Sequence, residues 1–163
     1  MYLCEAFHKS MQKNINIQNK KARFEYEILD KYVAGIQLTG TEIKSIRQSK
    51  ARITESFCEF NDRGELFVVN MYIEEYAFGH HYNHKTTSER RLLLNKRELR
   101  SLKKDVEAKG NTIVPLRLFL NENGWAKLEI ALAKGKKTHD KRETIKARDS
   151  KIDLARIKKS FNS

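Results

Sequence analysis

The chain has 163 residues, a formal net charge of +12 and a sequence pI near 9.7. Its length suits one domain with tails. The excess of Lys and Arg favours a polyanionic partner, because each cation placed against a phosphate releases condensed counterions. We expect neither a spanning helix nor a secretory signal, since no apolar run approaches the roughly 20 residues that a bilayer requires. Nucleic acid is therefore favoured over an anionic membrane or a merely solvated charged surface.

The positive charge is concentrated at the two ends of the chain. Residues 1–23 contain five Lys or Arg and one acid, residues 24–133 contain seventeen and sixteen, and residues 134–163 contain eleven and four. A basic terminal arm usually marks a segment that binds a polyanion. We expect three parts: an N-terminal extension over residues 1–18 without regular structure, a nearly neutral body over residues 19–133, and a basic tail from residue 134 onwards.

Alternating apolar residues predict a β-rich body. The even positions of residues 24–38 are mostly apolar, which predicts a long strand in which Gly35 permits a bend or bulge. Residues 55–60 and 65–73 are rich in aromatic and β-branched types, and the turn sequence at residues 61–64 predicts that they form a hairpin.

A second hairpin follows nearer the C-terminus. Alternating apolar positions over residues 114–120 and 126–132 flank the turn sequence at residues 121–124. Pro115 cannot donate a ladder hydrogen bond, so its strand should lie at an edge or carry a bulge.

Two helices are predicted from capping signals. Thr39 and Glu42 have the spacing of a capping box, which predicts a short helix after the first strand. Asn95 and Glu98 repeat that spacing before an apolar stripe of helical period, and Gly110 is a suitable stop.

Five strands with a helix between the third and fourth match the layout of the OB-fold. The predicted fold class is therefore mainly β with flanking helices, an OB-like closed or partly open β-barrel. The basic tail has a thin apolar face, formed by Ile145, Ile152, Leu154, Ile157 and Phe161. We expect the tail to be disordered in the free chain and to become helical on binding a partner.

The residues that carry chemistry show no catalytic pattern. Cys4 and Cys58 are too few for a disulfide framework, which suits a reducing cytoplasm. His80, His81 and His84 lack the spacing of zinc ligands and indicate a polar loop. The acids are interleaved with Lys and Arg, and no nucleotide-binding or nucleophile motif occurs. We expect no enzyme activity, no cofactor and no metal.

Several basic clusters are candidate phosphate contacts. Lys20, Lys21 and Arg23 precede a strand that carries aromatic residues, an arrangement suited to phosphate contacts and base stacking, although a solvated arm has the same composition. Lys44 and Arg47 lie three residues apart on the first predicted helix, where solvent exposure alone also suits them. The strongest cluster is in the tail: Lys134, Lys136, Lys137, Lys141 and Arg142.

These motifs together resemble the SmpB family of SsrA-binding proteins. The segments that carry the resemblance are Asn19-Lys20-Lys21-Ala22-Arg23, Ala34-Gly35-Ile36, Leu38-Thr39-Gly40-Thr41-Glu42-Ile43-Lys44-Ser45, Asn83-His84, Leu92-Leu93-Leu94, Ala133-Lys134-Gly135-Lys136-Lys137 and Asp140-Lys141-Arg142. The resemblance implies an OB-like barrel that binds the tRNA-like domain of tmRNA and delivers it to stalled bacterial ribosomes in trans-translation. The tail would become helical in the empty mRNA channel, near the decoding centre of the small subunit.

The resemblance also implies site residues. The RNA face of the barrel would comprise Asn19, Lys20, Arg23, Tyr26, Glu42, Lys44 and Asn83, and the ribosome-binding tail Lys134, Lys136, Lys137, Asp140, Lys141 and Arg142. At Val33 many relatives have instead a glutamate that contributes to RNA binding. We expect a monomer when free, and residues before Asn19, including a second candidate start at Met11, find no counterpart in the family.

Two other functions remain open at this point. A generic OB single-strand binder or ribosomal protein would bind diverse RNAs equally well at matched salt. A nuclease would require metal-dependent cleavage, for which the chain offers no plausible cluster of acidic ligands.

Overall fold

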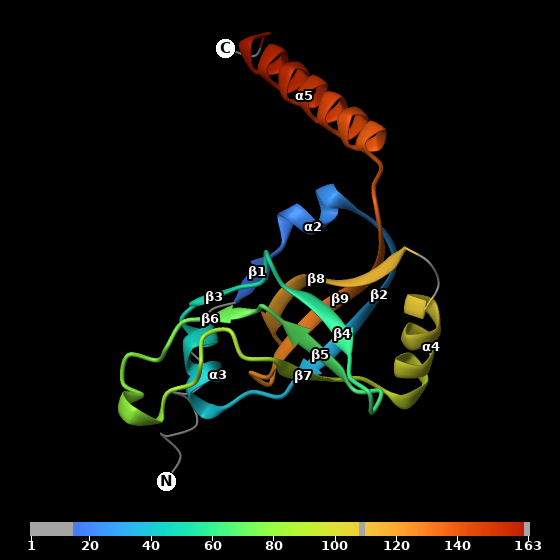
Figure 1. Cartoon of the computed structure of the whole chain (residues 1–163). Helices are drawn as coiled ribbons and strands as arrows, with labels where there is room; N and C mark the ends of the chain where they lie inside the picture. The colour runs from blue at the N-terminus through green and yellow to red at the C-terminus, as the bar shows by residue number, and fades with distance from the viewer. Residues whose placement is uncertain (1–14, 108–109, 162–163) are drawn as a thin grey trace.

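The computed structural model describes residues 15–107 and 110–161 (Figure 1). Its strands are β1 (Asn16–Gln18), β2 (Tyr26–Ile36), β3 (Ala51–Arg52), β4 (Phe57–Phe60), β5 (Leu66–Val69), β6 (Tyr72–Ile73), β7 (Arg90–Leu93), β8 (Asn111–Leu120) and β9 (Ala126–Gly135). Its helices are α2 (Lys20–Glu25), α3 (Gly40–Arg47), α4 (Lys96–Glu107) and α5 (Thr138–Phe161), with a 3-10 turn η1 (His80–Tyr82).

Six strands close into a ring. They are hydrogen-bonded in the order β8, β4, β5, β7, β2 and β9, and the β8–β9 hairpin joins the two ends. All the pairings are antiparallel, β1 extends the same side of β8 that pairs with β4, and β3 and β6 form a separate ribbon. Closure leaves few free backbone groups at sheet edges. The predicted fold class, an OB-like barrel with flanking helices, is confirmed.

Alternate strand residues fill the barrel. Leu66 and Val68 of β5 and Leu128 and Ile130 of β9 are fully buried, with intervening residues facing outward. The apolar stripe of α4 packs on this core, with Leu102 fully buried. Burial of this apolar surface is the main force that holds the helices on the barrel.

Both predicted hairpins are confirmed. Asn61 and Asn121 use their side-chain oxygens to accept hydrogen bonds from the backbone N–H groups of Glu65 and Trp125, at 2.8 and 2.7 Å. Gly64 and Gly124 have φ of +75° and +77°, a conformation that favours glycine.

The predicted helix caps and the bulge are also present. Thr39 and Glu42 form the reciprocal capping box of α3. The backbone N–H of Asn95 donates to the Glu98 carboxylate at the start of α4. The β8–β9 register shifts just after Pro115, as expected for a bulge. Gly35 instead lies in regular pairing, where β2 passes from β9 to β7.

Three local predictions differ from the structure. Helix α2 spans residues 20–25, although the last two of these were predicted to belong to the first strand. Strand β1 spans residues 16–18, which were predicted to belong to the N-terminal extension. The predicted strand at residues 65–73 is split into β5 and β6 at Asn70, whose φ of +58° interrupts the pleat. Of the rest of the predicted extension, Ile15 is described and residues 1–14 lie outside the described residues.

The basic tail also differs from its prediction. Strand β9 continues to Gly135, so Lys134 belongs to the barrel. Residues 138–161 form the single helix α5, which extends away from the barrel beyond α2 (Figure 1). The good helix propensity of its Lys, Arg and Ala residues accounts for this conformation. The structure gives these residues a helical conformation; the expected disorder of the tail in the free chain stays a prediction.

A buried ion pair holds α3 against β7. The Arg90 Nε atom lies 2.7 Å from Glu42 Oε1, and the two side chains are 2% and 4% exposed. Glu42 also accepts a hydrogen bond from the backbone N–H of Thr39. The remaining guanidinium nitrogens of Arg90 donate to carbonyl oxygens of Met71, Lys85, Thr86 and Ser88. The pair therefore connects α3, β7 and the segment between β6 and β7.

Neutralising Glu42 should destabilise the fold. In Glu42→Gln, Arg90 keeps its buried charge without a carboxylate partner, and losing one member of such a pair costs about 3–5 kcal/mol. Urea unfolding followed by circular dichroism measures the difference. The matched control is Glu75→Gln, at an exposed position, which should change the free energy of unfolding by no more than about 0.5 kcal/mol. Equal stability of the two variants would contradict this assignment.

Candidate nucleic-acid interface

The basic segment after Asn19 is folded as helix α2. Lys20 and Arg23 are exposed, and neither forms an ion pair with another residue in the described part of the chain. Lys21 Nζ instead lies 3.1 Å from Glu55 and 4.0 Å from Glu25. The hydrogen bond to Glu55 raises the pKa of Lys21 and keeps it charged. Lys20 and Arg23 are the cations of α2 whose charge is free for a phosphate.

Asn19, predicted as an RNA contact, is buried in the structure. Its side chain is the N-cap of α2, with Oδ1 accepting from the Ala22 N–H at 3.0 Å. Its Nδ2 donates to the carbonyl oxygens of Ile53 and Pro115. Because Asn19 is only 3% exposed, it fixes α2 on the barrel and presents no free polar atom to RNA.

The start of the tail lies against α2. Tyr26 pairs with Gly135 in the β2–β9 ladder. The backbone N–H of Lys136 donates to the Glu25 carbonyl at 3.0 Å, and its Nζ lies 3.4 Å from the Arg23 carbonyl. Residues far apart in the sequence therefore place Arg23 and Lys136 together, and Lys134 lies next to them on β9, opposite Glu27 of β2. We call the set Lys20, Arg23, Tyr26, Lys134 and Lys136 the α2 cluster.

The remaining tail residues follow this cluster. Lys137 and Arg142 are exposed. Asp140 and Lys141 belong to the backbone of α5, but their side chains lie outside the described residues. Exposed cations continue along the helix at Lys146, Arg148, Lys151 and Arg156.

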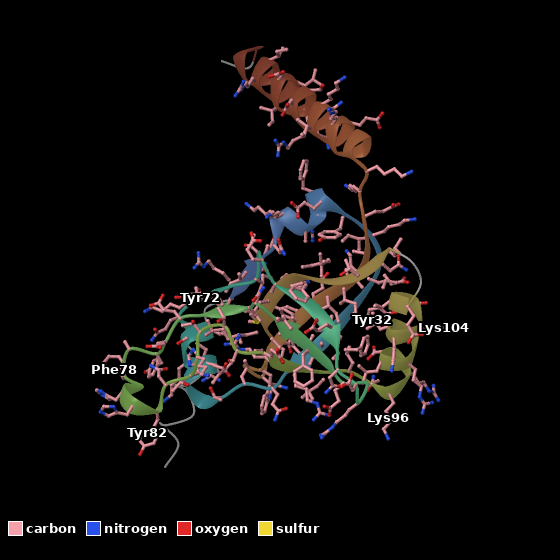
Figure 2. The ribbon with its side chains drawn as sticks, viewed as in Figure 1. Tyr32, Tyr72, Phe78, Tyr82, Lys96 and Lys104 are labelled. Atoms are coloured by element: carbon pink, nitrogen blue, oxygen red, sulfur yellow. The ribbon has the colours of Figure 1, made fainter. Side chains whose placement is uncertain are left out.

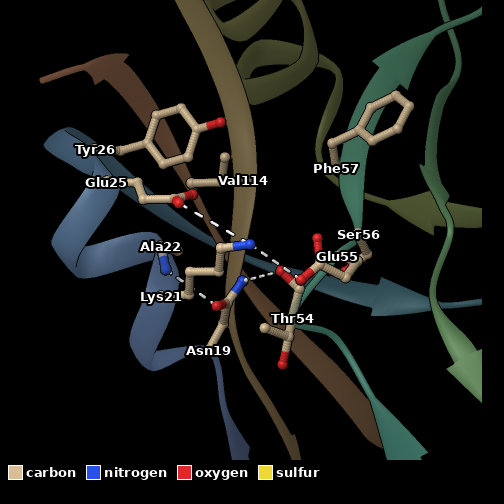
Figure 3. Close-up of a pocket in the computed structure, with 10 residues that line it drawn as sticks. All are labelled: Asn19, Lys21, Ala22, Glu25, Tyr26, Thr54, Glu55, Ser56, Phe57 and Val114. Carbon is tan, nitrogen blue, oxygen red and sulfur yellow. Dashed lines mark hydrogen bonds and ion pairs between the residues drawn. The ribbon is translucent and has the colours of Figure 1, made fainter.

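A polar cavity of about 130 Å³ lies beside α2 (Figure 3). The Lys21–Glu55 pair crosses it, while Tyr26 and Phe57 contribute aromatic walls. Its lining comprises Asn19, Lys21, Ala22, Glu25, Tyr26, Thr54, Glu55, Ser56, Phe57 and Val114. The Lys21–Glu55 ion pair joins α2 to the β3–β4 connection, so this feature also supports the orientation of α2.

Glu42, Lys44 and Asn83 lie away from α2, around α3 and the β6–β7 connection (Figure 1). Glu42 was predicted as an RNA contact, but its side chain is buried in the ion pair with Arg90. Lys44 is exposed, with Nζ 5.2 Å from the Tyr76 ring centroid. Asn83 bonds both backbone polar groups of Tyr76. The predicted RNA face therefore consists of two separate regions.

An exposed apolar groove was missed by the sequence prediction. Trp125 is 69% exposed at the β8–β9 turn, and Leu93 is also exposed. Together with Lys127 and Ile43 they line a groove of about 380 Å³. An indole beside an ammonium group can stack a base and contact its phosphate. The available signal was the single tryptophan of the chain, placed directly after a polar turn.

The described residues offer little for other chemistry. Burial raises the pKa of the Cys58 thiol, so this group remains protonated and unreactive. Among residues 15–107 and 110–161, no three His, Cys, Asp or Glu side chains gather as metal ligands. None of the described helices is long and apolar enough to cross a membrane.

Comparison with known proteins identifies close relatives. An SsrA-binding protein of Flavobacterium psychrophilum is 70% identical over 151 residues, which are 93% of this chain and 100% of the relative. That of Christiangramia forsetii is 60% identical over 161 residues, 99% of each chain. That of Bacteroides thetaiotaomicron is 54% identical over 146 residues, 90% of this chain and 97% of the relative.

The fold has a similar relative among solved structures. A chain from the structure described as "tmRNA-SmpB: a journey to the center of the bacterial ribosome" has a TM-score of 0.65 and 46% sequence identity. The match covers 80% of this chain and 94% of the other. The family model described as "SmpB protein" matches residues 16–160, nearly the whole described chain. With its closed barrel, basic α2 cluster and C-terminal helix, the chain belongs to the SmpB protein family.

Proposed function

We propose that this chain is an adaptor that binds tmRNA and delivers it to stalled bacterial ribosomes in trans-translation. The observation that carries the proposal is its 46% identity to a chain of the tmRNA-SmpB ribosome structure, over 94% of that chain. Relatives of up to 70% identity are named SsrA-binding proteins. The barrel holds the tRNA-like domain of tmRNA, and the tail enters the empty mRNA channel near the decoding centre.

The α2 cluster supplies phosphate contacts in this proposal. Lys20 and Arg23 have exposed cationic groups without a competing carboxylate among the described residues. Lys134 and Lys136 add positive charge on the neighbouring strand and at the start of the tail. Folded RNA is recognised largely through phosphates, 2′-hydroxyls and stacking, which suits such a cluster. These cations should dominate the salt dependence of binding.

Other predicted contacts act through the residues they position. Asn19 fixes the N-terminus of α2, and Glu42 fixes α3 through Arg90. The exposed Trp125 groove adds a surface for base stacking next to Lys127. Val33 lies exposed on the outer face of β2, where its isopropyl group offers no hydrogen bond to RNA.

The tail carries the second part of the function. Helix α5 presents cations over its exposed surface, and its exposed apolar side chains include Ile152 and Leu154. A cationic helix suits a channel lined by RNA, because its charges replace the counterions of the phosphates. The role requires no catalysis by the chain and operates in the cytoplasm, where ribosomes translate.

Replacing Lys20 and Arg23 by alanine should weaken tmRNA binding. Each lost phosphate contact lowers the slope of log K against log salt by about one. The affinity falls about tenfold or more per contact, since a hydrogen bond to a charged group contributes about 1.5–3 kcal/mol. Fluorescence anisotropy with labelled tmRNA at several salt concentrations measures both quantities.

The control for this pair removes the same charge elsewhere. Lys96→Ala with Lys104→Ala takes two exposed cations from α4, on another side of the barrel (Figure 2). This variant should retain nearly the wild-type affinity and slope. If both double variants lose affinity equally, net charge and not the α2 cluster determines binding. Equal binding of unrelated structured RNA by the wild type would instead favour a generic RNA binder.

Truncation after Lys137 should separate the two parts of the function. This end point keeps the whole of β9 and the Lys136 hydrogen bonds to α2, so the barrel retains its pairing. We expect tmRNA affinity within about tenfold of the full chain, because the truncated chain keeps the whole α2 cluster. Tagging of peptides on stalled ribosomes in a reconstituted translation system should be lost. Loss of all tmRNA affinity on truncation would contradict this division.

A further inference from the structure

The connection between β6 and β7 presents bare aromatic rings to solvent. We call residues 76–84 the aromatic loop. Phe78 is 73% exposed and Tyr82 is 92% exposed, and both side chains point away from the barrel (Figure 2). The loop lies at the opposite end of the molecule from α5 (Figure 1). Large apolar rings are normally buried, so their clustering on one exposed loop indicates a binding surface.

Hydrogen bonds fix the shape of this loop. The Asn83 side chain accepts from the Tyr76 N–H at 3.0 Å and donates to the Tyr76 carbonyl at 2.8 Å. A Cβ on Gly79 would lie 2.7 Å from the Asn83 amide nitrogen, so a larger residue there would displace the Asn83 side chain from Tyr76. His80 has a φ of +42°, which is unfavourable for a non-glycine residue. A loop held in this way presents its rings with little further ordering cost.

The loop is also anchored to the body of the protein. The buried His84 ring lies 2.9 Å from the Thr41 hydroxyl through Nδ1 and 3.2 Å from the Ile73 carbonyl through Nε2. Arg90 binds the carbonyl oxygens of Lys85 and Thr86, directly after the loop. The aromatic rings therefore stand on a firm support formed by α3, β6 and β7.

Cations border the rings. Lys44 Nζ lies 5.2 Å from the Tyr76 centroid, and the Tyr76 and Phe78 rings are 5.6 Å apart, edge to face. Lys44 and Lys85 are exposed and make no ion pair with the residues that the structure describes. Of the two acids just before the loop, Glu74 is paired with Lys50 at 2.8 Å, and Glu75 is exposed. Bare rings next to unpaired ammonium groups match the two parts of a nucleotide, its base and its phosphate.

We propose that the aromatic loop binds unpaired nucleobases of the RNA held by the barrel, which stack on Phe78 and Tyr82 while Lys44 contacts an adjacent phosphate. This proposal rests on the proposed function, because it assigns a second contact to the same RNA. The free ammonium groups favour RNA over a protein partner. Asn83, predicted as a direct contact, is a positioning residue that holds the two rings in place.

The test measures tmRNA binding by the full chain with Phe78→Ala and Tyr82→Ala combined. Stacking contributes about ten- to a hundredfold in affinity for each base. We expect the variant to lose affinity in that range with an unchanged salt slope, because neither side chain releases counterions. The α2 variant Lys20→Ala with Arg23→Ala should show the opposite pattern, with a reduced slope.

A conservative pair separates stacking from general apolar contact. Phe78→Leu with Tyr82→Leu keeps apolar side chains but removes both π-faces, so it should bind tmRNA as weakly as the alanine variant. Phe78→Trp with Tyr82→Phe keeps both rings and should bind at least as tightly as the wild type. Equal thermal unfolding midpoints of all variants are expected, since both positions are exposed.

Three outcomes overturn the proposal. Wild-type tmRNA affinity of the alanine variant at every salt concentration would remove the loop from the RNA interface. Wild-type tmRNA affinity of the leucine variant would show that apolar contact suffices without aromatic stacking. Normal tmRNA binding with weakened ribosome binding would assign the loop to a different partner. If the wild type itself fails to prefer tmRNA over unrelated RNA, the proposed function fails instead.

Discussion

The long antiparallel pairing of β2 with β9 is the interaction on which the arrangement of the molecule depends. Its register runs from Tyr26 opposite Gly135 to Gly35 opposite Lys127. Helix α2 immediately precedes β2 and the tail immediately follows β9, so the ladder places α2 beside the start of the tail. Charges more than a hundred residues apart thereby form one cluster. In the proposed function, the RNA-binding cations of α2 and the start of the tail therefore have a fixed relative position.

The buried Glu42–Arg90 pair has the corresponding role at the other end of the barrel. Burying two charges is expensive, so the pair gives little net stability by itself. Its value lies in geometry, because Arg90 also binds four carbonyl oxygens around the β6–β7 connection. Lys44 and the rings of the aromatic loop are thereby held at one place. In the proposed RNA interface, the cations at α2 and the aromatic rings near α3 would contribute differently, and only the former would depend strongly on salt.

Sequence reasoning succeeded where the signal is local. The Asn-initiated turns, the Thr39–Glu42 capping box and the stripe of α4 each occupy a few neighbouring residues. It failed where the decisive partner is distant. Alternation in residues 24–38 concealed the last two residues of α2. The start of this helix is fixed by Asn19, which binds carbonyl groups of residues 53 and 115. The family resemblance implied RNA contacts for Asn19 and Glu42, although buried partners use their hydrogen-bonding groups.

The tail combines the remaining constraints. Helix α5 has 24 residues, and its described apolar residues, such as Ile152 and Leu154, remain exposed. A helix with so little packing depends mainly on propensity and on pairs such as Asp153–Arg156, 3.7 Å apart. Such a helix opens and closes readily, so a surrounding RNA surface can stabilise it at small cost. Its first turn is nevertheless held near α2 by Lys136. The tail therefore has a fixed starting point and an adaptable length, which is the combination that probing a channel requires.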